Sequence, residues 1–339
     1  MAKRIGQYTI KCETMPSIIS SAAVVGKKEG EGPLGSCFDM VFEDGTLNEK
    51  TWEKSESRLQ TEAVTRALNK ASLSASQMDY IFAGDLLAQC IGSTFGLRSL
   101  GIPFLGQYGA CSTMAQTLAM AALFVEAGFA RHAVAVTSSH FCSAERQFRF
   151  PLEYGALRPP TAQWTATASG AAIVGSGGEA PYVSEITVGK IVDLGIKDTN
   201  NMGAAMAPAA AETISAYFQD MGNGPEDFDM ILTGDLGQVG AALLMDLLEK
   251  DQINIRKIHQ DCGLLLYDRQ TQNVNAGGSG CGCSAAVLCS HILKKLKQGE
   301  LKNILFVATG AMMSTTSSQQ GESIPGIAHL LHLKSALAK

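Results

Sequence analysis

The chain has 339 residues, a length that suits one large or two ordinary domains, and its net charge is −5, with 27 Lys and Arg against 32 Asp and Glu. Charged residues make up 17% of the chain and 35 residues are glycine, which excludes a disordered protein and favours a compact fold. No run of like charge indicates nucleic acid as a partner. The first residues lack the apolar run of a signal peptide, and no stretch suits a membrane-spanning helix, so we expect a soluble or peripheral protein.

The predicted elements alternate between strands and helices along the chain. Ser17 to Val25 is a predicted strand, and Trp52 to Lys70 is a predicted helix with one apolar face and one charged face. Thr113 to Val125 is apolar on all sides, which is typical of a buried helix. Val183 to Leu194 is a second opening strand, and Ala285 to Leu293 is a second uncharged helix. Two buried helices need a covering sheet on each side, which predicts five layers, αβαβα.

An internal repeat divides the chain into two halves. Residues 79 to 86 (DYIFAGDL) return as residues 229 to 236 (DMILTGDL), with five identities in eight positions. A second match relates Cys111-Ser112 and the strand ending at Thr137 to Cys283-Ser284 and the strand ending at Thr309. The repeat predicts an α/β protein of two duplicated βαβαβαββ halves, residues 1–178 and 179–339.

Each predicted buried helix begins in a turn of small residues. These turns are residues 107 to 112, with Cys111 and Ser112, and residues 277 to 284, with Cys281 and Cys283. A helix start leaves unpaired N–H groups and a positive dipole end, so it stabilises an anion or a thiolate. The pattern predicts that the pKa of Cys111 falls below the usual value of about 8.5, which suits a nucleophile. The alternative is that Cys111 is an inert residue of the core.

Histidines and arginines supply the other candidate site residues. His259 precedes the second glycine turn, His140 follows a predicted strand, and His329 lies in the closing strand. Each of these histidines has the alternative of a structural role. The predicted loop 140 to 155 carries Arg146 and Arg149 between aromatic residues. An arginine fork binds carboxylates and aromatic rings stack on a flat ligand, so this loop suits a small planar dicarboxylate.

The alternative for the two arginines is a structural network with Glu145 and Glu153. The sequence leaves these two interpretations of the loop equally open.

Taken together, these motifs resemble the thiolase fold in its ketoacyl synthase III branch, and within it the stage V sporulation protein AD family of spore-forming Firmicutes. The resemblance runs from about residue 6 to residue 332. Its longest matching stretches are residues 31–35, 83–87, 109–113, 144–149, 205–211 and 276–281.

The resemblance implies a protein that binds dipicolinic acid, pyridine-2,6-dicarboxylate, and takes part in its uptake into the forespore without catalysis. The implied partners are the membrane proteins of the same operon, at the forespore inner membrane. The implied assembly is a homodimer that pairs around the strand 101 to 108. No metal or cofactor is expected, and calcium only as a chelate of the ligand. An active acyl-transferring enzyme and a scaffold for membrane partners remain as alternatives.

The resemblance also implies roles for single residues. Cys111 falls on the nucleophile of the condensing enzymes and His259 on their first catalytic histidine. Cys281 falls where those enzymes carry an asparagine, so one group that polarises the carbonyl is missing. Gly310 is expected to supply a backbone N–H beside that of Cys111. The full predicted ligand-binding set is Cys111, Ser112, His140, Arg146, Arg149, His259, Cys281, Cys283, Gly310 and His329.

Overall fold

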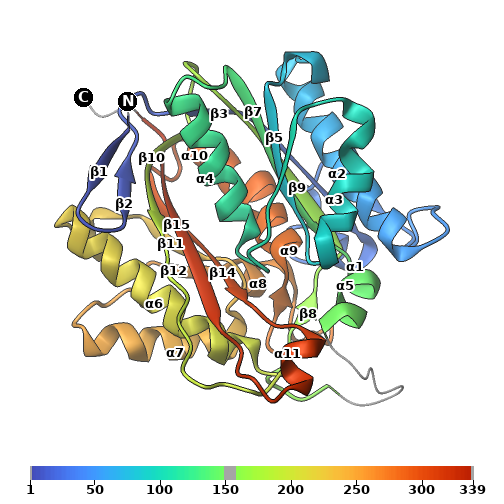
Figure 1. Ribbon diagram of the computed structural model, residues 1–339. Coiled ribbons are helices and arrows are strands. Elements are labelled where there is room, and N and C mark those ends of the chain that lie inside the picture. The colour runs from blue at the N-terminus through green and yellow to red at the C-terminus, as the bar shows by residue number, and fades with distance from the viewer. Residues whose placement is uncertain (1, 149–157, 337–339) are drawn as a thin grey trace.

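The computed structural model describes residues 2–148 and 158–336 (Figure 1). Ten of its strands form two sheets, which meet at a single register pair, Ser17 with Tyr182. The first sheet has the spatial order β3 (Ser17–Gly26), β9 (Ala168–Gly175), β7 (His132–Ser139), β5 (Tyr80–Gly84) and β6 (Phe104–Gly106). The second sheet has the order β10 (Tyr182–Val188), β15 (Gly326–Lys334), β14 (Asn303–Ala311), β11 (Met230–Thr233) and β12 (His259–Asp261).

Strand directions repeat between the two sheets. In the first sheet β3 and β7 run antiparallel to β9, whereas β5 and β6 follow as parallel neighbours. In the second sheet β10 and β14 run antiparallel to β15, and β11 and β12 follow in parallel. The predicted duplication of the fold is therefore confirmed. The predicted boundary at 178/179 falls in the segment between β9 and β10.

Five layers follow from the hydrophobic faces of the helices. Helix α2 (Trp52–Ala71) covers the outer face of the first sheet with Leu59, Ala63 and Val64. Helices α4 (Thr113–Glu126) and α9 (Cys281–Val287) lie between the two sheets, where apolar residues surround them. Helices α6 (Met202–Met221) and α7 (Gly237–Lys250) cover the outer face of the second sheet. The predicted αβαβα architecture is confirmed, and Figure 1 shows the central helices between the sheets.

Shorter elements complete the chain. The short strands are β1 (Lys3–Ile5), β2 (Thr9–Lys11), β4 (Met40–Phe42), β8 (Trp164–Thr165) and β13 (Gly278–Ser279). The short helices are α1 (Lys27–Gly30), α3 (Ile91–Leu97), α5 (Phe141–Phe148), α8 (Cys262–Leu266), α10 (Leu293–Gln298) and α11 (Thr315–Gln319). A π-helical segment, Leu288–Ile292, joins α9 to α10.

Two local predictions were wrong. The strand expected over Val183 to Leu194 ends at Val188, because the next residue, Gly189, packs against the backbone of Ala328 and the chain then leaves the sheet. The loop expected after His140 begins instead with helix α5. Ser143, Ala144 and Glu145 are buried while Arg146 is exposed, and this pattern is too short to stand out in the sequence.

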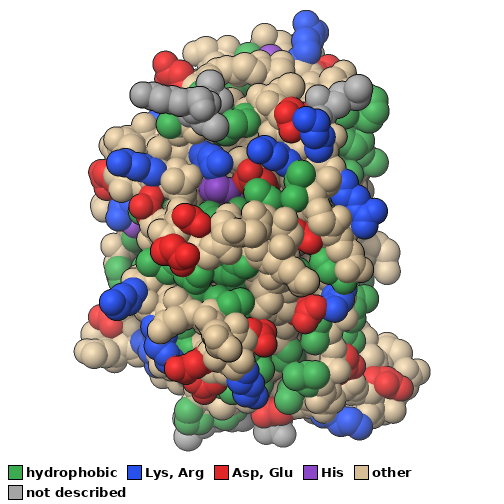
Figure 2. All heavy atoms as spheres, turned by 90° about the vertical axis from the view of Figure 1, so that its left-hand side faces the viewer, with side chains coloured by type: hydrophobic (Ala, Val, Ile, Leu, Met, Phe, Trp, Pro, Cys, Tyr) green, Lys and Arg blue, Asp and Glu red, His purple; other side chains and the backbone are tan. Residues whose placement is uncertain are grey.

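The molecular surface and the helices bear on the class of partner. On the face shown in Figure 2, acidic and basic side chains of the described residues are interspersed, and neither sign forms a broad patch. Among the helices of residues 2–148 and 158–336, none combines the length and apolar character needed to cross a membrane.

Candidate functional site

The Gly-Asp turns of the repeat place a buried carboxyl group after each parallel strand. Asp85 follows β5 and Asp235 follows Gly234 at the end of β11, and both side chains are completely buried. Asp235 accepts hydrogen bonds from the Gly280 N–H at 2.8 Å and from the hydroxyl groups of Ser279 at 3.1 Å and Thr309 at 2.9 Å. It therefore ties β11 and β14 to the start of α9. The repeat itself was the sequence signal for Asp235, which our sequence reasoning did not include in the site.

Cys111 lies in the turn before α4, directly after Ala110, whose φ is 49°. Its side chain is buried, with Sγ 3.9 Å from the Ser279 hydroxyl oxygen. Burial raises the pKa of the Cys111 thiol well above its usual range, and the neighbouring Asp235 raises it further. The predicted lowering of this pKa is wrong, because desolvation and a nearby carboxyl group outweigh the dipole of α4. The thiol is therefore protonated at neutral pH.

Cys111 lines a small pocket, called here the Cys111 pocket. Its lining residues are Leu86, Tyr108, Ala110, Cys111, Phe148, Met202, Ser279, Ala311 and Met313. The enclosed volume is about 20 Å³, which holds roughly one water molecule. Partial desolvation raises the pKa of Tyr108 to about 12, although 44% of the residue is exposed, so its phenol is a neutral hydrogen-bond donor. Tyr108 lies in the small-residue turn 107 to 112 but was not among the predicted site residues.

The structure brings Cys281 and Gly310 together with Cys111. Cys281 begins α9, shares a small buried cluster with Cys111, and donates its thiol to the Ser138 carbonyl at 3.0 Å. Gly310, near the end of β14, packs against the Cys111 turn: a Cβ atom there would lie 2.4 Å from the Gly109 carbonyl oxygen and 3.1 Å from the Ser112 nitrogen. Only glycine allows β14 this close to the turn.

His259 is not positioned next to Cys111. It lies on β12, the outer strand of the second sheet, and its Nε2 is 2.9 Å from the Thr233 hydroxyl oxygen. The Thr233 hydroxyl donates to Asp261 at 2.7 Å, so it accepts the proton of His259 Nε2. Burial lowers the pKa of His259 to about 4, which leaves the ring neutral. Cys111 thus carries a protonated thiol, and the hydrogen-bond partner of His259 Nε2 is Thr233.

Comparison with known proteins agrees with this fold and identifies the family. The family model for Stage V sporulation protein AD matches residues 6–334. The Stage V sporulation protein AD of Bacillus subtilis (strain 168) is 46% identical over 327 residues, which cover 96% of both chains. The chain belongs to the stage V sporulation protein AD family.

Two solved structures are similar in fold. The 3-oxoacyl-(acyl-carrier-protein) synthase III of Aquifex aeolicus VF5 has a TM-score of 0.58 and 14% identity, covering 94% of this chain and 99% of that one. A variant of OleA from Xanthomonas campestris has a TM-score of 0.59 and 15% identity, covering 98% of this chain and 99% of that one. The chain therefore has a thiolase-like fold.

Four other predicted site residues are occupied with structural contacts. The Ser112 hydroxyl donates to the Gly109 carbonyl at 2.6 Å, and Cys283 lies in the core between the sheets. His140 uses both ring nitrogens: Nε2 is 2.8 Å from the Gly45 carbonyl oxygen, and Nδ1 accepts the Cys142 N–H at 3.1 Å. His329 on β15 accepts the Gly189 N–H at Nδ1, 3.3 Å away, and burial lowers its pKa to about 4. None of the four side chains lines the Cys111 pocket.

Of the two predicted arginines, Arg146 is described and does not line the Cys111 pocket. Arg146 forms an ion pair with Glu53 of α2, so it faces the first outer helix. Arg149 lies outside the described residues, as does Glu153. Glu145 pairs instead with Arg158, at 2.8 Å. The guanidinium carbon of Arg158 lies 5.1 Å from the ring centre of Phe141. Arg158 was not among the predicted site residues, because it is distant along the chain from the residues of α5 that it contacts.

Within the described ranges, no three or more His, Cys, Asp or Glu side chains lie close enough together to hold a metal ion.

Proposed function

We propose that this sporulation protein binds dipicolinic acid and takes part in its uptake into the forespore, without turnover. The observation that carries the proposal is the state of Cys111: its thiol is protonated beside Asp235, and His259 is engaged with Thr233. Such a site keeps the position of a condensing enzyme's pocket while lacking its activated nucleophile. Membership of a stage V sporulation family supports the biological setting.

The chemistry of the Cys111 pocket supports a flat ligand with a hydrogen-bond acceptor. Leu86, Phe148 and Met313 offer apolar surface to a ring, and the Tyr108 phenol and Cys111 thiol are neutral donors for a carboxylate. Because the enclosed volume is about 20 Å³, far below a typical ligand cavity of about 300 Å³, binding requires side chains of the lining to move apart. We propose that the second carboxylate remains at the solvent side.

Isothermal titration with dipicolinate tests this assignment. Tyr108→Phe removes only the phenol oxygen and should weaken binding by roughly tenfold, the effect of one hydrogen bond to a charged group. Tyr182→Phe is the matched control, because its hydroxyl donates to the Gly178 carbonyl at 3.0 Å, outside the pocket. Absence of any heat signal at about millimolar ligand, or equal effects of the two variants, would refute the proposal.

Acyl transfer by Cys111 is the competing function, since the fold family is enzymatic. Incubation with acyl-CoA followed by intact-mass spectrometry separates the two. We expect no acyl adduct on Cys111 in the native protein, because its thiol is protonated and buried. A stoichiometric adduct that is lost in Cys111→Ala would establish the enzyme instead.

We further propose that the protein has the membrane proteins of the same operon as partners, at the forespore inner membrane.

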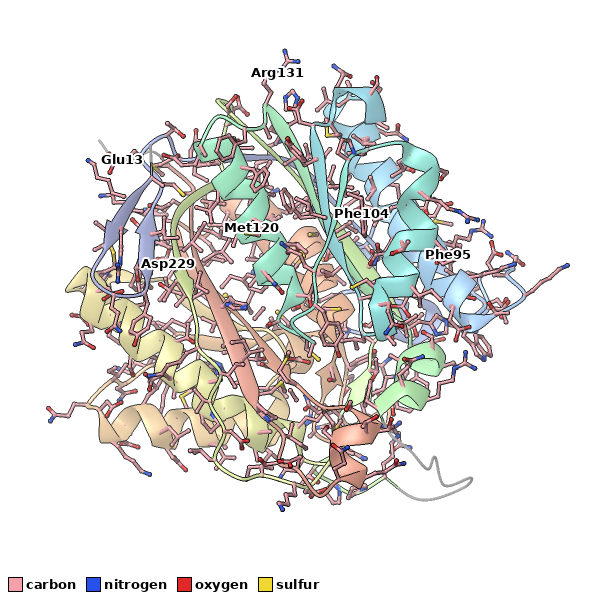
Figure 3. The ribbon with its side chains drawn as sticks, in the orientation of Figure 1. Glu13, Phe95, Phe104, Met120, Arg131 and Asp229 are labelled. Atoms are coloured by element: carbon pink, nitrogen blue, oxygen red, sulfur yellow. The ribbon has the colours of Figure 1, made fainter. Side chains whose placement is uncertain are left out.

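We also propose that the protein forms a homodimer that pairs through β6. Large apolar side chains are exposed at this edge: Phe95 is 52%, Phe104 39% and Leu105 42% exposed. Figure 3 shows Phe95 on α3 and Phe104 on the outer strand. An edge strand with apolar side chains is a template for pairing. Light scattering should give twice the chain mass, and Leu105→Lys should give the monomer.

Calcium is proposed to enter only as a chelate of the ligand. Titration with calcium alone should then give no heat, whereas titration with the calcium chelate of dipicolinate should.

A further inference from the structure

A second cavity lies between β3 and the α10 region and shares no lining residue with the Cys111 pocket. Its volume is about 340 Å³, within the range of cavities that hold small molecules. Both halves of the fold build it: β3 and the end of α2 from the first, the π-helical segment and α10 from the second (Figure 1). Because three lysines line it, we call it the lysine cavity.

The charges on its walls do not balance. Lys70 Nζ lies 2.5 Å from Asp39 Oδ1 and donates to the Ser21 carbonyl at 2.9 Å. Asp39 is the acidic residue of the lining, so this pair is neutral overall. Lys294 and Lys297 are solvent-exposed and form no ion pair with any described residue, which leaves two positive charges in the lining of the cavity. Because they are three positions apart on α10, both lie on the same helix face.

Helix electrostatics account for only part of this arrangement. A cation in the last turn of a helix is favoured by the dipole, which suits Lys295 and Lys297. Lys294 lies just before the last turn of the continuous helix that α9, the π-helical segment and α10 form, so the dipole supports it less. The spacing of three residues places Lys294 and Lys297 on the helix face that lines the cavity and leaves Lys295 off that face.

The π-helical segment that leads into α10 forms part of the cavity wall. The π-helical segment Leu288–Ile292 inserts an extra residue per turn, a feature frequent at functional sites. The Ser21 hydroxyl of β3 donates to the Cys289 carbonyl of this segment at 2.7 Å, which ties the two halves together at the cavity. Ile18 and Leu293 add apolar surface to the lining.

We propose that the lysine cavity binds a small organic dianion, a dicarboxylate or a phosphate monoester. Its negative groups contact Lys294 and Lys297, and its carbon skeleton packs against Ile18 and Leu293. Charge-assisted hydrogen bonds to an ammonium group are roughly twice as strong as neutral ones, so the two lysines supply most of the affinity. This site is independent of the dipicolinate site proposed above.

Titration calorimetry with benzene-1,3-dicarboxylate and with phenyl phosphate tests the proposal on the full chain. The double variant Lys294→Gln, Lys297→Gln should weaken the favoured probe by roughly ten- to hundredfold, the effect of losing charged hydrogen bonds. Lys295→Gln removes the same charge from the same helix but from outside the cavity, so it should bind like the wild type. The probe that binds more tightly shows whether the cavity prefers a carboxylate or a phosphate ligand.

Tyr108→Phe separates this site from the Cys111 pocket. We expect it to leave unchanged the share of probe binding that the Lys294→Gln, Lys297→Gln double variant removes, even if dipicolinate binding to the Cys111 pocket fails altogether. A second readout, acetylation of single lysines followed by peptide mass spectrometry, should show that the bound probe protects Lys294 and Lys297 but not Lys295. The proposal is overturned if neither probe binds, if Lys295→Gln weakens binding as much as the double variant, or if Tyr108→Phe alone abolishes it.

Discussion

Glu56, on the inward face of α2, is expected to hold its proton in the native protein at neutral pH. Its carboxyl group is completely buried, and burial together with the nearby Asp85 raises its pKa from 4.5 to about 8. Hydrogen bonds from the hydroxyl groups of Ser138, at 3.0 Å, and Ser143, at 2.6 Å, only partly oppose this rise. The Ser138 backbone also accepts the Cys281 thiol, so this carboxyl group lies directly behind the Cys111 pocket.

The size of the effect follows from linkage between protonation and folding. Between pH 4.5 and pH 8 the native state retains a proton that the unfolded chain releases, so the free energy of unfolding falls as the pH rises. Each pH unit in this interval lowers the free energy of unfolding by about 1.4 kcal/mol, so the total loss over the interval is at most about 5 kcal/mol. Glu56→Gln keeps the shape of the side chain and removes the titration. As the pH rises through this interval, the free energy of unfolding of the variant should therefore increase by several kcal/mol relative to that of the wild type.

Urea unfolding followed by circular dichroism at a series of pH values measures this gain. Glu62→Gln is the matched control on the same helix, because Glu62 is only half-buried and lies 3.7 Å from Arg66. The control should follow the wild-type dependence on pH. If the Glu56→Gln curve also runs parallel to the wild type, or falls below it as the pH rises, Glu56 is ionised in the native state and the reasoning fails.

Three further changes probe the site. Iodoacetamide at neutral pH should modify the half-buried Cys37 and spare Cys111 until the chain unfolds, as read by peptide mass spectrometry; rapid native labelling of Cys111 would contradict a protonated, buried thiol. Gly310→Ala should lower the free energy of unfolding by about 2 kcal/mol, because its Cβ would lie 2.4 Å from a carbonyl oxygen, whereas Gly45→Ala, with no atom within 4 Å, should change it little. Arg146→Ala should leave dipicolinate titrations unchanged, since the guanidinium faces α2 and not the Cys111 pocket; weaker binding would place Arg146 in the site.

Some features of the candidate site could be predicted from the sequence because they depend on neighbouring residues. Cys111 and Cys281 each lie at the start of a buried helix, as the small-residue turns indicated. Helix α5 was missed because its eight residues carry little periodic signal, and the strand after Val183 was predicted too long because the sequence does not show that Gly189 must pack against another strand.

The direction of the Cys111 pKa could not be predicted in the same way. The helix start is local and was visible in the sequence, but the Asp235 carboxyl group that opposes it comes from a strand 124 positions away along the chain. The sequence likewise identified His259 as a candidate site residue but could not show which group it contacts. Its hydrogen bond to Thr233 depends on how β11 and β12 pair.

The sequence by itself determined the duplication, the layered α/β architecture and the two helix starts, because repeats and hydrophobic periodicity are properties of local segments. Only the tertiary structure decided the protonation of Cys111, the partners of the arginines and the lysine cavity. Each of these depends on desolvation or on charges brought together from distant parts of the chain, and those are set by packing rather than by spacing along the sequence.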